Sequence, residues 1–328
     1  MKKIAIIIPY YGHFGSIMEF WIKSISNNPS IDFLLFTDLS INNKPQNLLT
    51  INLTFNELIN LAQKNFEFKI CAPDPYKFID FRPAYGEIFS KYLKEYDFWG
   101  FCDTDLIFGD IRKFITDSLL DQYDKILAQG HFTLYKNTPE VNSIYKNCKE
   151  PYYKQVFTFP LNCAFDEYYG TSGYWAKYLT DRFYRKILFD DLDCYKYEFT
   201  PLFKKNIGKY YIYSYENGKL FRIYELNHKI HKEETMYVHF QKRKMKLATS
   251  PSNYFLMIPN VFIAYNNNIN IDTLHHLYSN KKWYPHKYKL YIKRLLNKLK
   301  KVHASLSPKE FGNPTISKNG YIYYQHKE

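Results

Sequence analysis

The sequence predicts an α/β protein with a mixed, mainly parallel sheet flanked by helices, and three observations lead to this class. Short segments at residues 4–8, 32–37 and 98–102 that are wholly or mostly apolar are typical of strands that are covered on both faces. Segments with helical spacing lie between these runs, and strands that alternate with helices favour parallel pairing. The chain has 328 residues, which is enough for one large α/β domain or two smaller ones.

The first predicted strand covers residues 4–8, a run of mostly β-branched residues. Two lysines before this run make it resemble a signal peptide. The run is too short for that role, and Pro9-Tyr10-Tyr11 follows in place of a small-residue cleavage site. We therefore expect a buried strand. The sequence contains no run of about 18 apolar residues, so we expect no membrane-spanning helix.

Helices and strands are expected to alternate from there to residue 128. Thr54 is a predicted helix N-cap, because Glu57 stands three residues later in the capping-box position. The expected elements are helices over 16–25, 54–65 and 84–96, a helix from 110 onward, and strands over 32–37, 48–53, 98–102 and 125–128. Residues 150–215 are dense in Tyr, Phe and Lys and predict no clear order of elements.

Two carboxylates follow the strand predicted at residues 98–102. Asp103 and Asp105 stand where this apolar segment leaves the sheet, and Leu106-Ile107-Phe108 returns the chain to the core. In a turn after a strand both side chains can converge on one cation, and oxygen ligands suit Mn²⁺ or Mg²⁺. A solvated loop is the alternative, because so short a pattern also arises by chance.

Five segments, in this order along the chain, resemble GT-A glycosyltransferases, above all the bacterial enzymes that build capsule and lipopolysaccharide chains. They are Ile6-Ile7-Ile8-Pro9-Tyr10-Tyr11, Phe36-Thr37-Asp38, Asp80-Phe81-Arg82-Pro83-Ala84-Tyr85-Gly86, Phe101-Cys102-Asp103-Thr104-Asp105 and Tyr237-Val238-His239-Phe240-Gln241-Lys242-Arg243-Lys244. The resemblance covers about residues 1–250. It implies a Rossmann-like GT-A catalytic domain over 1–250, with a nucleotide-binding half at about 1–110 and an acceptor half at about 111–250.

The resemblance implies transfer of a sugar from a nucleotide diphosphate donor, with a UDP-sugar favoured and UDP-galactose suggested by the family likeness. Asp103, Asp105 and His239 would hold Mn²⁺ or Mg²⁺, which neutralises the charge that develops on the leaving diphosphate. The residues implied to contact the donor are Pro9, Tyr10, Tyr11, Asp38, Asp80, Arg82, Asp103, Lys242 and Arg243. A structural or solvated role is the alternative for each of the polar residues among them.

The acceptor side is expected to supply a general base if the transfer inverts the anomeric centre. Asp166 and Glu167 are the candidates, with a helix-capping or surface pair as the alternative. A retaining transfer would need no such base. Residues 130–137 resemble the strand that shapes the donor-sugar pocket, and His131 is equally compatible with a loop role. Nearby aromatic residues such as Trp175 would stack on an acceptor sugar or belong to the core.

Positive charge is concentrated near the end of the chain. Residues 281–301 contain nine Lys or Arg and no acid, so +4 of the net +13 remains for the rest. Apolar residues recur there at three- and four-residue intervals, which predicts a basic amphipathic helix over about 284–302, within an extension covering 251–328. This helix would bind an anionic membrane or pack on the core.

The expected location is the cytoplasmic face of the cell membrane, where the enzyme would be peripheral and act on a glycan or a lipid-linked oligosaccharide. Five widely spaced cysteines without a CxxC pair are typical of reduced thiols.

Two other functions share parts of this pattern. A phosphatase of the haloacid-dehalogenase kind also places two aspartates after a strand, but its motif lies near the chain start and continues differently from Leu106-Ile107. A nucleic-acid-binding protein would use interleaved Lys and Tyr. The charge is confined to one segment and no RNP-type, zinc or helix-turn-helix pattern is found, so nucleic acid is not the expected partner.

Overall fold

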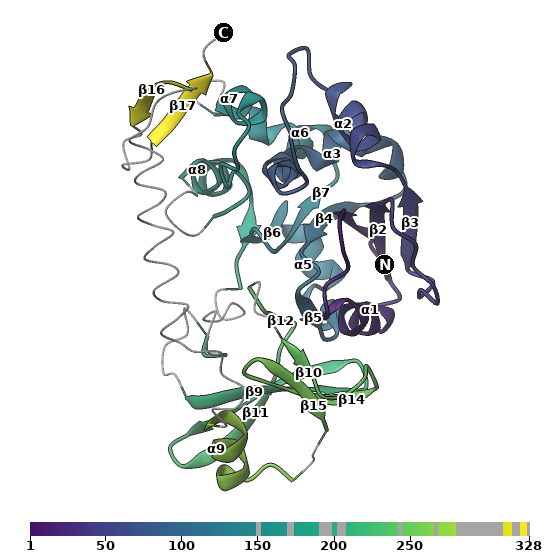
Figure 1. Ribbon diagram of the computed structural model, residues 1–328, viewed down its shortest axis with the longest axis vertical. Coiled ribbons are helices and arrows are strands. Elements are labelled where there is room, and N and C mark those ends of the chain that lie inside the picture. Colours follow the sequence, from purple (N-terminus) through teal and green to yellow (C-terminus); the bar gives the residue numbers. More distant parts are fainter. Residues whose placement is uncertain are drawn as a thin grey trace.

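The computed structural model describes residues 1–148, 152–168, 174–189, 199–201, 208–241, 245–265, 268–279, 311–316 and 322–326. Within them the chain forms two main sheets, and Figure 1 shows the first sheet with its helices above the second. The predicted α/β class is confirmed, because mixed sheets are flanked by helices.

The first sheet has the strand order β3-β2-β1-β4-β7-β6-β8. Its strands are β1 (Ile4–Pro9), β2 (Ile31–Thr37), β3 (Leu48–Asn52), β4 (Phe98–Cys102), β6 (Lys125–Gln129), β7 (Phe132–Lys136) and β8 (Lys186–Ile187). Parallel pairing joins β3 to β2, β2 to β1 and β1 to β4, whereas β7 is antiparallel to both β4 and β6. The carboxyl ends of β1 to β4 therefore share one edge, where open α/β sheets bind ligands.

Strand β1 shows why these strands lack polar alternation. Successive side chains of a strand point to opposite faces of the sheet. Ala5 and Ile7 join the core that includes α2 (Phe55–Gln63) and α3 (Tyr85–Ile88), whereas Ile6 belongs to the core that includes α1 (Met18–Ser26). Both faces are covered, as the apolar run predicts.

Helix α2 begins with the predicted capping box. The Glu57 backbone N–H donates to Thr54 Oγ1 at 3.3 Å, and the Thr54 backbone N–H donates to the Glu57 carboxylate at 2.8 Å. Two of the free backbone donors at this helix end are satisfied by the pair.

The expectation of a single helix over residues 84–96, before β4, is wrong. The chain instead forms a 3₁₀ helix (Lys77–Ala84), α3 and a 3₁₀ turn (Ser90–Tyr92). A Cβ on Gly86 would come within 2.4 Å of Asn142 Oδ1, so the backbone at Gly86 packs directly against the Asn142 side chain. Phe89 and Leu93 are also buried. Packing on several sides, in place of one amphipathic face, sets the backbone here.

The helix expected from residue 110 is divided in two. It consists of α4 (Ile111–Phe114) and α5 (Asp117–Gln122). The side chain of Asp110 caps the first and the side chain of Thr116 caps the second. A second capping residue inside the segment explains the division.

The second sheet is mainly antiparallel and has the order β11-β10-β9-β14-β15-β13. Its strands are β9 (Lys209–Glu216), β10 (Lys219–Leu226), β11 (Lys229–Glu234), β13 (Lys246–Leu247), β14 (Tyr254–Ile258) and β15 (Val261–Ala264). Phe20 of α1 packs on Phe255 and Phe262, with ring centroids 4.9 and 4.2 Å away. Strands β14 and β15 extend this sheet beyond residue 250, the expected end of the catalytic domain.

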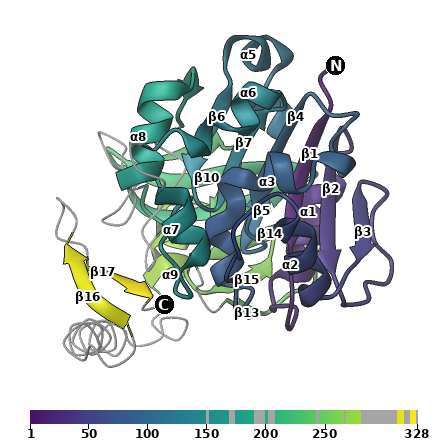
Figure 2. The same ribbon diagram turned by 90° about the horizontal axis from the view of Figure 1, so that it is seen from above.

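A short antiparallel pair, β5 (Leu106–Phe108) with β12 (Tyr237–His239), links the two parts of the molecule. The remaining elements are α6 (Pro139–Asn142), a 3₁₀ turn (Ile144–Lys146), α7 (Tyr152–Thr158), α8 (Tyr174–Phe183), α9 (Ile271–Ser279), β16 (Phe311–Ile316) and β17 (Ile322–His326). Figure 2 shows α7 and α8 beyond the end of the first sheet opposite to β3.

No helix in the described part of the chain is both long enough and apolar enough to cross a membrane. The basic helix expected over 284–302 lies outside the described residues and stays a prediction.

Candidate metal centre

Two buried strands fix the positions of Asp103 and Asp105. Both β4 and β5 are fully buried, so the turn between them emerges at the carboxyl edge of the first sheet. The Asp103 backbone N–H donates to the His131 carbonyl at 2.8 Å, and the Asp105 carbonyl accepts from the Phe240 N–H at 2.9 Å. The backbone of the turn is thus held on both sides, while the two side chains stay 31% and 23% exposed.

His239 completes a group of three potential metal ligands. It ends β12 and lies opposite Leu106 in the pairing with β5. His239 Nε2 is 3.3 Å from Asp105 Oδ1, and one ligand atom each from Asp103, Asp105 and His239 all lie within 4.8 Å of one another. Two carboxylate oxygens with one imidazole nitrogen form a donor set that fits Mn²⁺. Mg²⁺ would use the oxygens and retain water ligands.

Arg82 is enclosed between two of the predicted carboxylates. It pairs through Nη2 with Asp103, and through Nη1 with Asp166 Oδ2 at 2.9 Å. Nη1 also donates to the Gly130 carbonyl, and the guanidinium lies 4.7 Å from the centre of the Phe101 ring. Burial lowers the pKa of Arg82, but the two carboxylates outweigh burial and raise this pKa above its ordinary value. The side chain is only 9% exposed, so Arg82 acts mainly on its protein neighbours.

Asp166 and Glu167 have different surroundings. The Asp166 side chain is 2% exposed and is held by Arg82. Glu167 is half-buried, and its carboxylate lies directly over Gly130, where a Cβ would come within 2.5 Å of Glu167 Oε1. Burial raises the pKa of Glu167, and the negative charge of Asp103 raises it further. Of the two, Glu167 is the carboxylate that is partly exposed to solvent.

Asp80 is fully buried, and its hydrogen bonds join two segments of the protein. It accepts from Lys77 Nζ at 2.7 Å, and its oxygens also accept from the backbone N–H groups of Cys163 and Phe165 at 2.8 and 3.0 Å. These bonds tie the 3₁₀ helix that carries Arg82 to the segment that carries Asp166. The predicted contact between Asp80 and a nucleotide has no exposed Asp80 surface to support it.

The remaining expected donor contacts lie at the carboxyl ends of β1 and β2. Pro9 is the last residue of β1, and the Tyr10 hydroxyl donates to the His13 carbonyl at 2.6 Å. The Tyr11 hydroxyl is buried and has no hydrogen-bond partner within the described ranges. Burial raises the pKa of Tyr11, and exposed Asp38 nearby contributes. Lys242 and Arg243 lie outside the described residues.

Comparison with protein families bears on the whole of this region. Residues 6–266 match a family of unknown function, DUF6625. The chain belongs to this family. Comparison with curated proteins gives no match. The matched range of this DUF6625 protein ends just after β15, so it contains the candidate metal centre and most of both sheets.

The turn between β6 and β7 opens the segment 130–137, which was expected to shape a donor-sugar pocket; its contacts with Arg82, Glu167 and the metal-ligand candidates were not expected. In this DUF6625 protein, Gly130 makes room for Glu167 and accepts from Arg82, and the next residue, His131, accepts from the Asp103 backbone. The His131 ring also stacks on His239 with centroids 3.9 Å apart. A Gly-His pair between two apolar runs was the signal available in the sequence.

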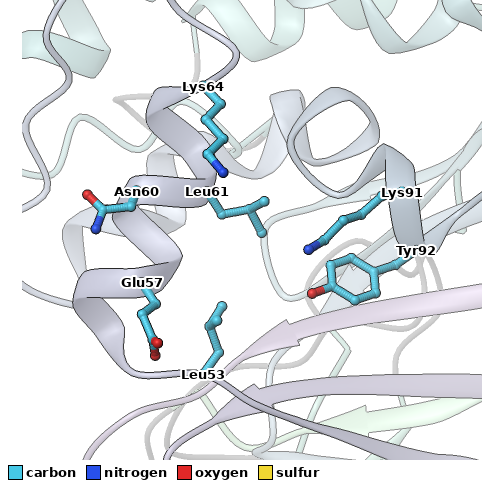
Figure 3. Close-up of a pocket in the computed structure, with 7 residues that line it drawn as sticks. All are labelled: Leu53, Glu57, Asn60, Leu61, Lys64, Lys91 and Tyr92. Atoms are coloured by element: carbon cyan, nitrogen blue, oxygen red, sulfur yellow. The ribbon is translucent and has the colours of Figure 1, made fainter.

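A separate hollow of about 260 Å³ lies between α2 and the 3₁₀ turn at Ser90–Tyr92. Figure 3 shows the side chains of Lys64 and Lys91 pointing toward it. It is lined by Leu53, Glu57, Asn60, Leu61, Lys64, Lys91 and Tyr92. None of these residues belongs to the candidate metal centre, so the hollow is not part of that site.

Proposed function

We propose that this DUF6625 protein is a metal-dependent glycosyltransferase that moves a sugar from a nucleotide diphosphate donor, with UDP favoured, to a glycan acceptor. One observation carries the proposal: one ligand atom each of Asp103, Asp105 and His239 lie within 4.8 Å of one another at the carboxyl end of β4. The parallel order β3-β2-β1-β4 supports a nucleotide at the same edge, because such sheets bind ligands outside their carboxyl ends.

The three ligands would hold Mn²⁺ or Mg²⁺ against the diphosphate. A divalent ion there neutralises the charge that develops as the bond to the leaving group breaks. Within the chain, Arg82 orients Asp103 by ion pairing, and the β5–β12 pairing sets His239 beside Asp105.

For an inverting transfer, Glu167 is the proposed general base. The acceptor hydroxyl oxygen attacks the anomeric carbon, and its proton passes to the Glu167 carboxylate. The bond between that carbon and the diphosphate oxygen breaks, and the electron pair leaves with the diphosphate. Glu167 suits this role better than Asp166 because it is partly exposed and Asp166 is already paired with Arg82.

We further propose that the enzyme acts in capsule, O-antigen or lipooligosaccharide synthesis at the cytoplasmic face of the cell membrane. The acceptor would be a growing glycan or lipid-linked oligosaccharide, and residues 281–301 would attach the enzyme to anionic lipid. Those residues lie outside the described part, so their charge and spacing in the sequence are the support for this part of the proposal.

Release of nucleoside diphosphate from a panel of nucleotide sugars tests the proposal. We expect the full chain to release UDP from at least one UDP-sugar with Mn²⁺ present, and to lose this activity in EDTA. Asp105→Asn should lower the rate by at least about 100-fold, as expected when a transition-state charge loses its stabilising group.

Asp110→Asn is the matched control. Asp110 is a nearby carboxylate that caps α4, and asparagine caps helices equally well. Metal-independent release, or equal rates for Asp105→Asn and Asp110→Asn, would contradict the proposed function.

A further inference from the structure

His131 is in contact with two side chains of β12 at once. Tyr237 and His239 are two residues apart on this strand, so their side chains point to the same face. His131 Nε2 is 2.9 Å from the Tyr237 hydroxyl, and the His131 ring stacks on His239 with centroids 3.9 Å apart and planes 24° apart. All three residues are buried.

These contacts restrict how the His131 ring can lie. The hydrogen bond to Tyr237 fixes the rotation of the ring about its last side-chain bond, and the Tyr237 ring meets it edge to face at 5.4 Å. The backbone of His131 is held as well, because its carbonyl accepts from the Asp103 N–H. A ring fixed in this way forms a rigid surface.

We infer that His131 is a positioning residue for the metal ligand His239, an inference that rests on the proposed function. The flat face of His131 blocks rotation of the His239 ring out of the orientation in which Nε2 faces Asp105 at 3.3 Å. His131 is not itself among the three converging ligands, and its Nε2 is engaged by Tyr237. It therefore acts on the ion through His239.

The expected size of the effect follows from the behaviour of groups that orient metal ligands. Their loss typically weakens metal binding by about 10- to 100-fold. A pair of substitutions separates the ring from the volume that it fills. His131→Phe keeps a flat ring against His239, whereas His131→Leu fills the space without one.

The test is a calorimetric titration of the full chain with Mn²⁺ alone. We expect His131→Leu to bind Mn²⁺ about 10- to 100-fold more weakly than the wild type, and His131→Phe to recover most of that loss. Melting temperatures measured without metal are the check that both variants fold. His231→Leu is the matched control, because His231 also stacks on an aromatic ring, that of Tyr224 at 5.4 Å, in the second sheet. It should bind Mn²⁺ as the wild type does.

Each outcome has a separate meaning. If the wild type binds Mn²⁺ and His131→Leu binds it equally well, the role of His131 is wrong and the proposed function stands. If His131→Phe is as weak as His131→Leu, stacking is not the cause and the inference falls. If the wild type itself does not bind Mn²⁺, the metal centre of the proposed function is wrong.

Discussion

Replacing Arg82 with methionine is the most informative perturbation of the network behind the metal centre. The substitution keeps an unbranched side chain over the Phe101 ring but removes the charge between Asp103 and Asp166. Removing one partner of a buried ion pair typically costs about 3–5 kcal/mol, because the remaining charge has lost its compensation. The Gly130 carbonyl also loses its donor.

The structure indicates where this cost arises. Asp103 is 31% exposed and can recruit water, whereas Asp166 is 2% exposed and cannot. Most of the penalty should therefore come from Asp166. Neutralising that residue in the same protein, as Arg82→Met/Asp166→Asn, should recover about 2 kcal/mol, which is within the range of coupling energies for contacting residues.

Equilibrium urea unfolding of the wild type, the two single variants and the double variant measures this coupling. We expect Arg82→Met to be less stable by about 3–5 kcal/mol and the double variant to be more stable than Arg82→Met. The reasoning would be refuted by a loss below about 1 kcal/mol in Arg82→Met, or by additive effects of the two substitutions.

Three further predictions concern other parts of the molecule. Gly130→Ala should push the Glu167 carboxylate aside, because the added Cβ would come within 2.5 Å of Glu167 Oε1, and should lower the rate of UDP release at least about 10-fold while stability changes by less than about 1 kcal/mol. Gly15→Ala is the control, since no atom lies within 4 Å of the added Cβ, and equal rates of UDP release for the two variants would count against the predicted displacement of Glu167. Burial lowers the pKa of Lys125 to about 7 from 10.5, so the unfolded chain binds more protons between these pH values and the contribution of Lys125 to stability rises with pH across that window. The stability of Lys125→Met should therefore exceed that of the wild type by the largest margin near pH 7. In urea unfolding this margin should shrink toward pH 10 by roughly 1 kcal/mol per pH unit. A margin that stays constant with pH would argue against a neutral buried lysine. Replacing four of the nine basic residues in 281–301 with Gln should remove about 1 kcal/mol of vesicle binding per residue, measured by sedimentation with phosphatidylserine vesicles, and leave UDP binding intact. Loss of both would show that the segment belongs to the folded core.

Where local chemistry decides the structure, the sequence was a good guide. The apolar run of β1, the capping box of Thr54 and Glu57, and the strand that ends just before Asp103 each depend on neighbours along the chain. The meeting of Asp105 with His239 was expected from a family resemblance, and the pairing of β5 with β12 brings them together.

Other features depend on contacts between distant segments and could not be predicted locally. Strand β9 places Tyr211 and Tyr213 in one core and Ile212 in another, so it lacks the polar alternation that marks a surface strand. Arg82 looks like an exposed donor contact in the sequence. Its burial depends on Asp166 and on the turn at Gly130, both far along the chain.

The central claim, that Asp103, Asp105 and His239 bind a divalent ion together with a nucleotide diphosphate, is tested most directly by the melting temperature of the full chain with Mn²⁺ and UDP. Ligand at about 100 times its dissociation constant adds about 2.7 kcal/mol to the stability of the folded state. We predict a rise of several degrees that requires both Mn²⁺ and UDP, is absent in Asp105→Asn and persists in Asp110→Asn. No rise in the wild type, or the same rise in Asp105→Asn, would contradict the claim.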